Sequence, residues 1–299
     1  MRMVGQRKWN RRLAVLVFLS PALLGLLAFQ LLPMVSSVVI SFSDWDLLTK
    51  WTHIRFIGWD NYANIFKDEK SYTSIKNVFY FLIGYMPAIT ILGTLFAVLL
   101  NRNIRGIKLY RAAVFVPVIT SWVAVSIVWR WLLNGQSGLV NYLLSRVGID
   151  GPIWLQDDHW ALIAIIAVTL WKDIGFVSII LLAGLQDISE DYYEAADLDG
   201  ASAWSKLWRI TVPMLSPTLF FVITISLINS FQLFDQVLIM TNGGPAGATS
   251  TIVEQVYKNA FQFNKMGFAA AQSWVLFVII FTVTMIVQRL QRRWVVYDR

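Results

Sequence analysis

The sequence predicts an all-α membrane protein with six transmembrane helices, and three observations support that fold class. First, 57% of the 299 residues are hydrophobic and only 14% are charged, whereas a soluble domain is about one quarter charged. Second, six apolar runs are long enough to cross a hydrocarbon core of about 30 Å, which takes about 20 helical residues. Third, lysines and arginines gather at the ends of these runs.

The composition also excludes several classes of function. The chain contains no cysteine, so it has no disulfide, no thiolate metal site and no cysteine nucleophile. A net charge of +7 and a pI near 9.6 are compatible with nucleic-acid binding. The basic residues form no stripe on a soluble domain, however, so we attribute the charge to membrane topology and expect no nucleic-acid partner.

The first two predicted spans cover residues 13–40 and 75–100. Residues 1–12 are basic, and the apolar run that follows them is too long for the core of a cleaved signal peptide, so we interpret it as an uncleaved span. Residues 41–72 are mixed in character and predict an extracytoplasmic loop. Pro87 lies inside the second span, where neighbouring membrane helices can accommodate it.

The next two predicted spans cover residues 112–133 and 160–185. A compact basic turn at 101–111 precedes the third span, which carries Pro117 near its start. Residues 134–158 contain several glycines and are predicted to form a loop.

A polar central segment at residues 187–213 separates the fourth span from the fifth, which covers 215–240. A glycine-containing outer loop at 241–265 leads to the sixth span, at 268–287. The expected organisation is a short N-terminal segment, one six-helix domain and a basic tail, at residues 1–12, 13–288 and 289–299.

The distribution of basic residues predicts the orientation in the membrane. Fifteen lysines and arginines lie in the termini, the turn at 101–111 and the central segment, and seven lie in the loops on the other side. Because basic loops stay in the cytoplasm, both termini and the central segment are predicted to be cytoplasmic.

Two other classes of membrane protein, enzymes and ion-driven secondary transporters, fit the sequence less well. For an enzyme, the only histidines are His53 and His159, neither in a metal-ligand spacing, and no G-x-S-x-G motif supplies a nucleophile, so we expect no catalytic or metal site. For an ion-driven secondary transporter, more spans and an internal repeat are usual, and no clear repeat is present. A transporter driven by an external energy source fits better.

The central segment predicts two short helices. Ser189 can act as N-cap, Glu190 and Asp191 in the first helical turn complement the positive end of the helix dipole, and residues 192–199 continue the helix. Gly200 permits a turn, Ser202 can cap a second helix that runs to Ile210, and Pro213 marks the start of the next span. Anionic lipid would repel so acidic a surface, so a protein partner is expected.

The spacing of this segment resembles the EAA loop of permease subunits of bacterial ABC importers. The match runs Glu194-Ala195-Ala196, three residues, Gly200, nine residues, Ile210, one residue, Val212 and Pro213, with Val212 where that family usually has leucine. Other stretches resemble the first permease of its carbohydrate-uptake systems. They are Pro21 with the run to Pro33, Gly58-Trp59-Asp60-Asn61-Tyr62, Leu182-Ala183-Gly184-Leu185-Gln186 and Thr241-Asn242-Gly243-Gly244-Pro245.

The resemblance implies a type I ABC importer permease core with a cytoplasmic coupling helix, in a bacterial inner membrane. It implies four kinds of partner: a second permease as heterodimer, two ATP-binding cassette subunits, an extracytoplasmic sugar-binding protein and the lipid bilayer. The chain has no phosphate-binding G-x-x-x-x-G-K-[ST] loop, so ATP and Mg²⁺ are expected on the cassette subunits and no cofactor on this chain. The residues that resemble the family's ATPase-coupling positions are Glu194, Ala195, Ala196, Asp199, Gly200, Ile210 and Pro213.

Polar residues within the spans suggest a substrate path. Ser226, Asn229 and Ser230 share one helical face near mid-depth, where they line a cavity or hydrogen-bond to another helix. The resemblance to the maltose permease puts Ser226 and Ser230 at sugar-contacting positions and adds three more. These are Trp122, Asp173 and Phe176.

Other charges in the spans leave alternatives open, and so does the solute. Lys172 and Asp173 either serve the sugar or pair with the second permease. Arg130 is expected to snorkel to the outer interface, and Asp235 to serve an outer gate or a subunit contact. The solute is a sugar or, as in close relatives, glycerol 3-phosphate or another polar solute.

Overall fold

The computed structural model describes residues 15–46, 48, 54–102 and 104–296. Within them, five helices are long and apolar enough to cross a membrane, and a bent pair of shorter helices makes a sixth span if it counts as one. The predicted all-α membrane fold is therefore confirmed. The expected basic segment at residues 1–12 lies outside the described residues.

The chain divides into two compact units, and the first comprises Met1–Ile65 and Tyr257–Trp274. It contains the first span, Val15–Ser41, close to the predicted range. Its elements include η1 (Leu27–Leu31), α2 (Leu32–Ser41), β1 (Ser43–Asp44), β2 (Arg55–Phe56), most of α3 (Asp60–Lys67), η4 (Lys258–Gln262) and the start of α14 (Met266–Gln291). The two short strands pair antiparallel. The side-chain amide of Asn61 connects α3 to the end of α2 and to β1, because its nitrogen donates to the carbonyl oxygens of Ser41 and Ser43, each at 2.9 Å.

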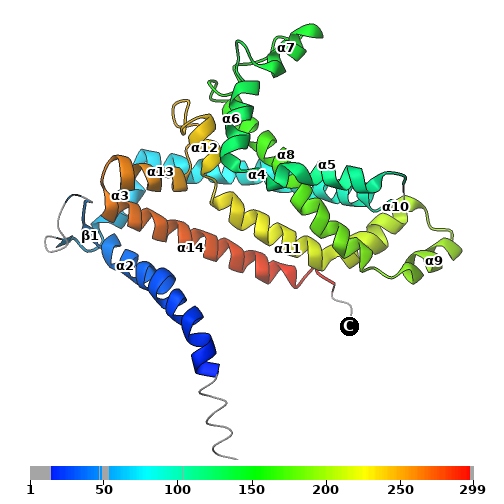
Figure 1. The fold of residues 1–299 in the computed structure, drawn as a ribbon, viewed down its shortest axis with the longest axis horizontal. Coiled ribbons are helices and arrows are strands. Elements are labelled where there is room, and N and C mark those ends of the chain that lie inside the picture. Colours follow the sequence, from blue (N-terminus) through cyan, green and yellow to red (C-terminus); the bar gives the residue numbers. More distant parts are fainter. Residues whose placement is uncertain (1–14, 47, 49–53, 103, 297–299) are drawn as a thin grey trace, which may run out of the picture. The chain divides into compact units, whose positions relative to one another are not determined.

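The second unit comprises Phe66–Val256 and Val275–Arg299 (Figure 1). Its helices are α4 (Glu69–Leu100), α5 (Ile107–Ile119), α6 (Trp122–Leu132), α7 (Leu139–Arg146), α8 (Trp160–Gln186), α9 (Glu190–Leu198), α10 (Ala203–Lys206), η3 (Leu207–Thr211), α11 (Val212–Phe231), α12 (Asp235–Met240) and α13 (Ile252–Tyr257). The later residues of α14 also belong to it.

Helix α8 is the centre of the second unit, and glycines allow its neighbours to approach closely. A Cβ at Gly175 of α8 would lie 2.2 Å from the Val114 carbonyl oxygen of α5. A Cβ at Gly184 would lie 2.4 Å from the Thr218 hydroxyl of α11. Small residues at helix contacts are the usual means of tight packing in membranes, where burial from water gives no driving force between helices.

The third span was predicted as one helix at 112–133, whereas the structure divides this stretch between two helices. Helices α5 and α6 meet at an angle of 98°. Pro117 removes a backbone donor near the end of α5, and Thr120 and Ser121 then adopt extended backbone with ψ near 138° and 139°. The basic turn predicted at 101–111 is also shorter than expected, because α5 already begins at Ile107.

The fifth span begins earlier and ends earlier than predicted. It is a continuous helix over Ala203–Phe231: Ser202 caps its start, as predicted, by accepting from the Ser205 N–H at 3.3 Å, but the helix does not end at Ile210. A wide π-helical turn, η3, precedes Pro213, which lies at the first turn of α11 and has no N–H to donate. The helix then ends at Phe231, and Asp235 starts the separate helix α12.

Three segments predicted to be loops contain helix, and the first of them, 41–72, holds α3 and the first residues of α4. The segment 134–158 holds α7, and the outer loop at 241–265 holds α13 and η4. The glycine-containing sequences at 134–158 and 241–265 are typical of irregular backbone, which is why the sequence predicts loops there. The fourth and sixth spans agree closely with α8 and α14.

Candidate functional site

Helix α9 is an exposed helix with a cap at each end. Ser189 Oγ accepts a hydrogen bond from the Asp191 N–H at 3.3 Å, as the sequence predicted. At the other end, Gly200 adopts φ +72° and the Ala201 N–H donates to the Ala196 carbonyl oxygen at 2.9 Å. The chain can reverse here because glycine tolerates the left-handed backbone.

Three contacts hold α9 to the rest of the second unit. Ile188, just before the helix, is buried in the main hydrophobic core. The hydroxyls of Tyr193 and Thr211 lie 3.0 Å apart and share a hydrogen bond. Lys206 Nζ forms an ion pair with Asp197 Oδ1 at 2.7 Å. These contacts connect α9 to the first turns of the fifth span.

The structure separates the seven predicted coupling residues into two groups. Four of them are exposed on or beside α9: Glu194, Ala195, Asp199 and Gly200. Ala196 is half-buried on the same helix. Ile210 and Pro213 lie instead in the continuous fifth span and are half-buried there. Leu198 was not predicted, yet its apolar side chain is 91% exposed at the end of α9.

A second candidate site is a cavity of about 270 Å³ inside the second unit. It is lined by α4, α6, α8, α11 and α12 and by the connection from α11 to α12. The lining residues are Phe81, Tyr85, Trp122, Thr169, Asp173, Asn229, Ser230, Gln232, Leu233, Phe234, Asp235 and Gln236. The cavity therefore combines aromatic rings with hydroxyl, amide and carboxylate groups.

The polar centre of the cavity is the pair Tyr85 and Asp173. The Tyr85 hydroxyl donates to Asp173 Oδ2 at 2.7 Å and so joins α4 to α8. The ring of Phe81 stacks on Tyr85 with centroids 5.1 Å apart. Tyr85 is thus held between an aromatic ring and a carboxylate, which fixes its position in the wall.

Lys172 interacts with α5 and α6. Its Nζ donates to the Val118 carbonyl oxygen at 3.0 Å and lies 4.9 Å from the centre of the Trp122 ring. In an unbroken helix the Val118 carbonyl would accept from residue 122, but the bend removes that donor. Lys172 thus supplies a donor at the break and orients Trp122 by a cation–π contact.

The structure brings four of the six predicted path residues to the cavity: Trp122, Asp173, Asn229 and Ser230. Ser226 lies one turn away and is buried, and its carbonyl oxygen accepts from the Ser230 hydroxyl at 2.7 Å. Phe176 does not line the cavity and is 39% exposed. Of the other two charges considered, Asp235 lines the cavity. Arg130 donates a hydrogen bond to the Ile239 carbonyl oxygen at the end of α12, a contact that the sequence did not predict.

Sequence reasoning missed part of the polar wall, namely Tyr85, Thr169, Gln232 and Gln236. Tyr85 lies in an apolar run and resembles an interfacial tyrosine, so only its contact with Asp173 reveals its role. Gln232 and Gln236 were placed inside a span predicted as one helix. Their position on both sides of a helix break is what turns them toward the cavity.

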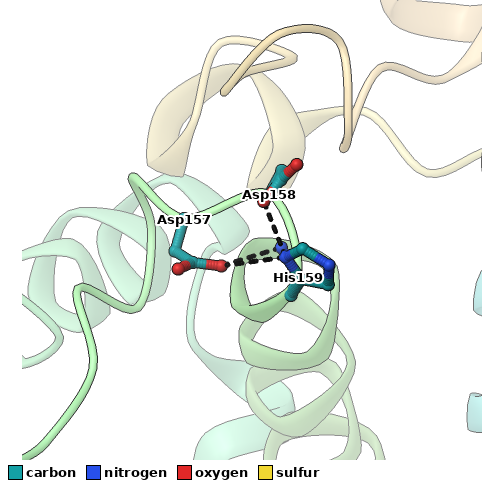
Figure 2. Close-up of side chains that lie close together, drawn as sticks. All are labelled: Asp157, Asp158 and His159. Atoms are coloured by element: carbon teal, nitrogen blue, oxygen red, sulfur yellow. Dashed lines mark hydrogen bonds and ion pairs between the residues drawn. The ribbon is translucent and has the colours of Figure 1, made fainter.

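The start of α8 carries an exposed cluster of Asp157, Asp158 and His159 (Figure 2). Asp157 Oδ1 accepts from the backbone N–H groups of His159 and Trp160, at 2.9 and 3.3 Å. Asp158 Oδ1 lies 2.8 Å from His159 Nδ1. These contacts match a capped helix start, so the cluster has a structural explanation.

Comparison with known proteins agrees with this architecture. The family described as "Binding-protein-dependent transport system inner membrane component" matches residues 89–297. The probable ABC transporter permease protein YesP of Bacillus subtilis is 36% identical, over 96% of this chain and 93% of its own. The lactose transport system permease protein LacF of Rhizobium radiobacter is 33% identical, over 88% and 89%.

A solved structure shares the fold. A chain in the crystal structure of a bacterial alginate ABC transporter, in complex with its alginate pentasaccharide-bound periplasmic protein, has a TM-score of 0.84. It is 24% identical, and the match covers 96% of each chain. From its spans, its fold and the extent of these matches, the chain belongs to the family of binding-protein-dependent transport system inner membrane components.

Proposed function

We propose that the chain is one of two permease subunits of an ATP-driven importer, and that it passes a sugar across the cytoplasmic membrane of a bacterium. The sugar is delivered by an extracytoplasmic binding protein. Two ATP-binding cassette subunits, which carry ATP and Mg²⁺, supply the energy. Both termini and α9 face the cytoplasm, in line with the excess of basic residues on that side.

The observation that carries this proposal is the chemistry of the 270 Å³ cavity. Rings such as Phe81 and Trp122 offer apolar faces to the C–H side of a sugar ring. Asp173, Asn229 and Ser230 offer acceptors and donors for its hydroxyls. An ion pathway has no need of aromatic walls, so the secondary-transporter alternative is less well supported.

The charge of the cavity favours a neutral sugar over glycerol 3-phosphate. Asp173 and Asp235 are both among the lining residues, and no lysine or arginine is among them. The neighbouring Lys172 is engaged with a backbone carbonyl. A phosphate would meet two carboxylates without a compensating cation, which is unfavourable at this depth.

For energy coupling, the exposed face of α9 docks on a cassette subunit. The exposed Leu198 is an apolar anchor, and the acidic residues around it give charge complementarity to a basic groove. The contacts of α9 with Thr211 and Lys206 carry its displacement into the fifth span, which lines the cavity.

The proposal is tested by purifying the affinity-tagged chain, in mild detergent, from cells that also express the genes adjoining its own. We expect a second permease and cassette subunits to co-purify. ATP hydrolysis by the reconstituted complex should rise when sugar-loaded binding protein is added. Variants Asp173→Asn and Ser230→Leu should alter the apparent affinity for that sugar.

Two outcomes would contradict the proposed function or the proposed role of the cavity. A chain that purifies alone, and whose uptake stops when the proton gradient collapses while ATP is maintained, is a secondary transporter. Unchanged affinity and rate in both cavity variants would remove this cavity from the solute path.

A further inference from the structure

The outer loop from Thr241 to Thr251 joins α12 to α13 and is held by an internal network of hydrogen bonds. The hydroxyls of Thr241 and Thr249 lie 2.7 Å apart, and Thr249 Oγ1 donates to the Gly244 carbonyl oxygen at 2.7 Å. Asn77 of α4 donates from its amide nitrogen to the carbonyl oxygens of Gly247 and Ser250, at 2.8 and 3.0 Å. The loop is therefore fixed both to itself and to the second span.

A buried carboxylate anchors the other end of this loop. Glu254 is fully buried at the start of α13. Its Oε2 accepts from Ser250 Oγ at 2.8 Å and from Gln255 Nε2 at 3.1 Å. Gly243 lies against the same carboxylate, because a Cβ there would be 2.9 Å from Glu254 Oε1. A buried charge persists only where such hydrogen bonds compensate it.

One side chain joins this network to the cavity. Thr251 Oγ1 donates to the Leu233 carbonyl oxygen at 2.8 Å, and both residues are buried. Leu233 lies in the break between α11 and α12, where the backbone has no helical partner of its own. The three residues Leu233, Phe234 and Asp235, which we call the rim, all line the cavity.

We propose that Thr251 is a positioning residue of the transport cavity: its hydroxyl holds the rim to the outer loop, and the loop thereby sets the shape and solute affinity of the cavity. Glu254 supports Thr251 by fixing the loop and the first turn of α13. The part of this inference that concerns the solute rests on the proposed function. The attachment of the rim to the loop does not depend on what the cavity carries.

The chain offers a direct measurement of rim position, since it contains no cysteine. A single Leu233→Cys substitution places a thiol on the rim, where the native side chain is 3% exposed. Its reaction with a membrane-impermeant maleimide is measured in the assembled transporter, without sugar. A second reporter, Ala161→Cys, occupies a fully buried site on α8 and detects general loosening.

In the Thr251→Val background we expect Leu233→Cys to react about tenfold faster, because a buried carbonyl that loses its hydroxyl partner favours local opening. Thr251→Ser keeps the hydroxyl and should restore slow labelling. Glu254→Gln should give a smaller increase, and Ala161→Cys should stay slow throughout. Ser178→Ala is the matched control, since Ser178 is a buried hydroxyl on α8 that bonds only within its own helix turn, to the Ile174 carbonyl at 2.6 Å.

Unchanged labelling of Leu233→Cys in the Thr251→Val background would overturn the attachment, as would equal acceleration of Ala161→Cys. For the solute, Thr251→Val should raise the KM of sugar uptake three- to tenfold and leave the maximal rate within twofold. An altered maximal rate with unchanged KM would refute the role in affinity. If Asp173→Asn and Ser230→Leu both leave uptake unaffected while the rim is released as expected, the assignment of this cavity to the solute path fails and the attachment stands.

Discussion

Helix α9 and the membrane cavity differ in how each is built. The α9 segment is continuous in sequence, is capped by its own neighbours, and leaves Glu194 and Leu198 exposed. The cavity draws residues from five helices and a helix break, and its central pair, Tyr85 and Asp173, is 88 residues apart in sequence. In the proposed function, the exposed continuous surface binds a partner subunit, whereas the buried surface assembled from several helices binds the solute.

The largest expected effect is a charge reversal on the exposed surface. Glu194→Lys should reduce sugar-stimulated ATP hydrolysis and uptake on the order of 100-fold, because juxtaposed like charges in an interface cost several kcal/mol. The folded yield of the subunit should not change. Glu69→Lys, an exposed acid in the first turn of α4, is the matched control. Wild-type transport by Glu194→Lys would show that α9 is not a docking surface.

The second prediction concerns the buried contact between α5 and α8 and the thermal stability of the protein. Gly175→Val would drive a side chain into the Val114 carbonyl of α5, and overpacking of this kind costs about 1–3 kcal/mol. The thermal midpoint of the detergent-solubilised protein, followed by size-exclusion chromatography, should fall. Gly25→Val, which meets nothing within 4 Å, should leave that midpoint unchanged. Equal midpoints for both variants would contradict the tight contact of α5 with α8.

The third prediction concerns the cavity wall. Tyr85→Phe removes the hydroxyl that donates to Asp173, and the apparent affinity for sugar should fall about tenfold, since a hydrogen bond to a charged group contributes about 1.5–3 kcal/mol. Tyr80→Phe, on the exposed side of the same helix, is the control. In a double-mutant cycle with Asp173→Asn the effects should be strongly non-additive. Simple additivity would mean that the two residues act separately.

The smallest expected effect is the loss of a helix cap. Ser189→Ala should destabilise the first turn of α9 by about 1 kcal/mol. Amide hydrogen exchange at residues 190–192 should therefore accelerate a few-fold, with uptake only slightly reduced. Ser145→Ala, an exposed serine in α7, should leave these amides unaffected. A large loss of uptake would show that the cap has a role beyond helix stability.

Local features of the molecule were predictable from the sequence, because their causes are local. The caps of α9, the turn at Gly200 and four of the spans follow from hydropathy and from the backbone preferences of serine and glycine. The bend after Pro117 and the break after Phe231 were missed. A proline or a polar residue in a span is compatible with both a straight and a broken helix, and the neighbouring helices decide between them.

The sequence by itself determined the membrane class, the number of spans, the orientation expected from basic residues and the exposed α9 surface. Only the tertiary structure decided which polar groups face one another. In the folded chain, Tyr85 donates a hydrogen bond to Asp173, Lys172 donates to the carbonyl oxygen of Val118, and Thr251 donates to the carbonyl oxygen of Leu233. The physical reason is that buried polar groups favour hydrogen-bond partners, and the partners of Tyr85, Lys172 and Thr251 lie on other elements, at sequence distances that no periodicity encodes.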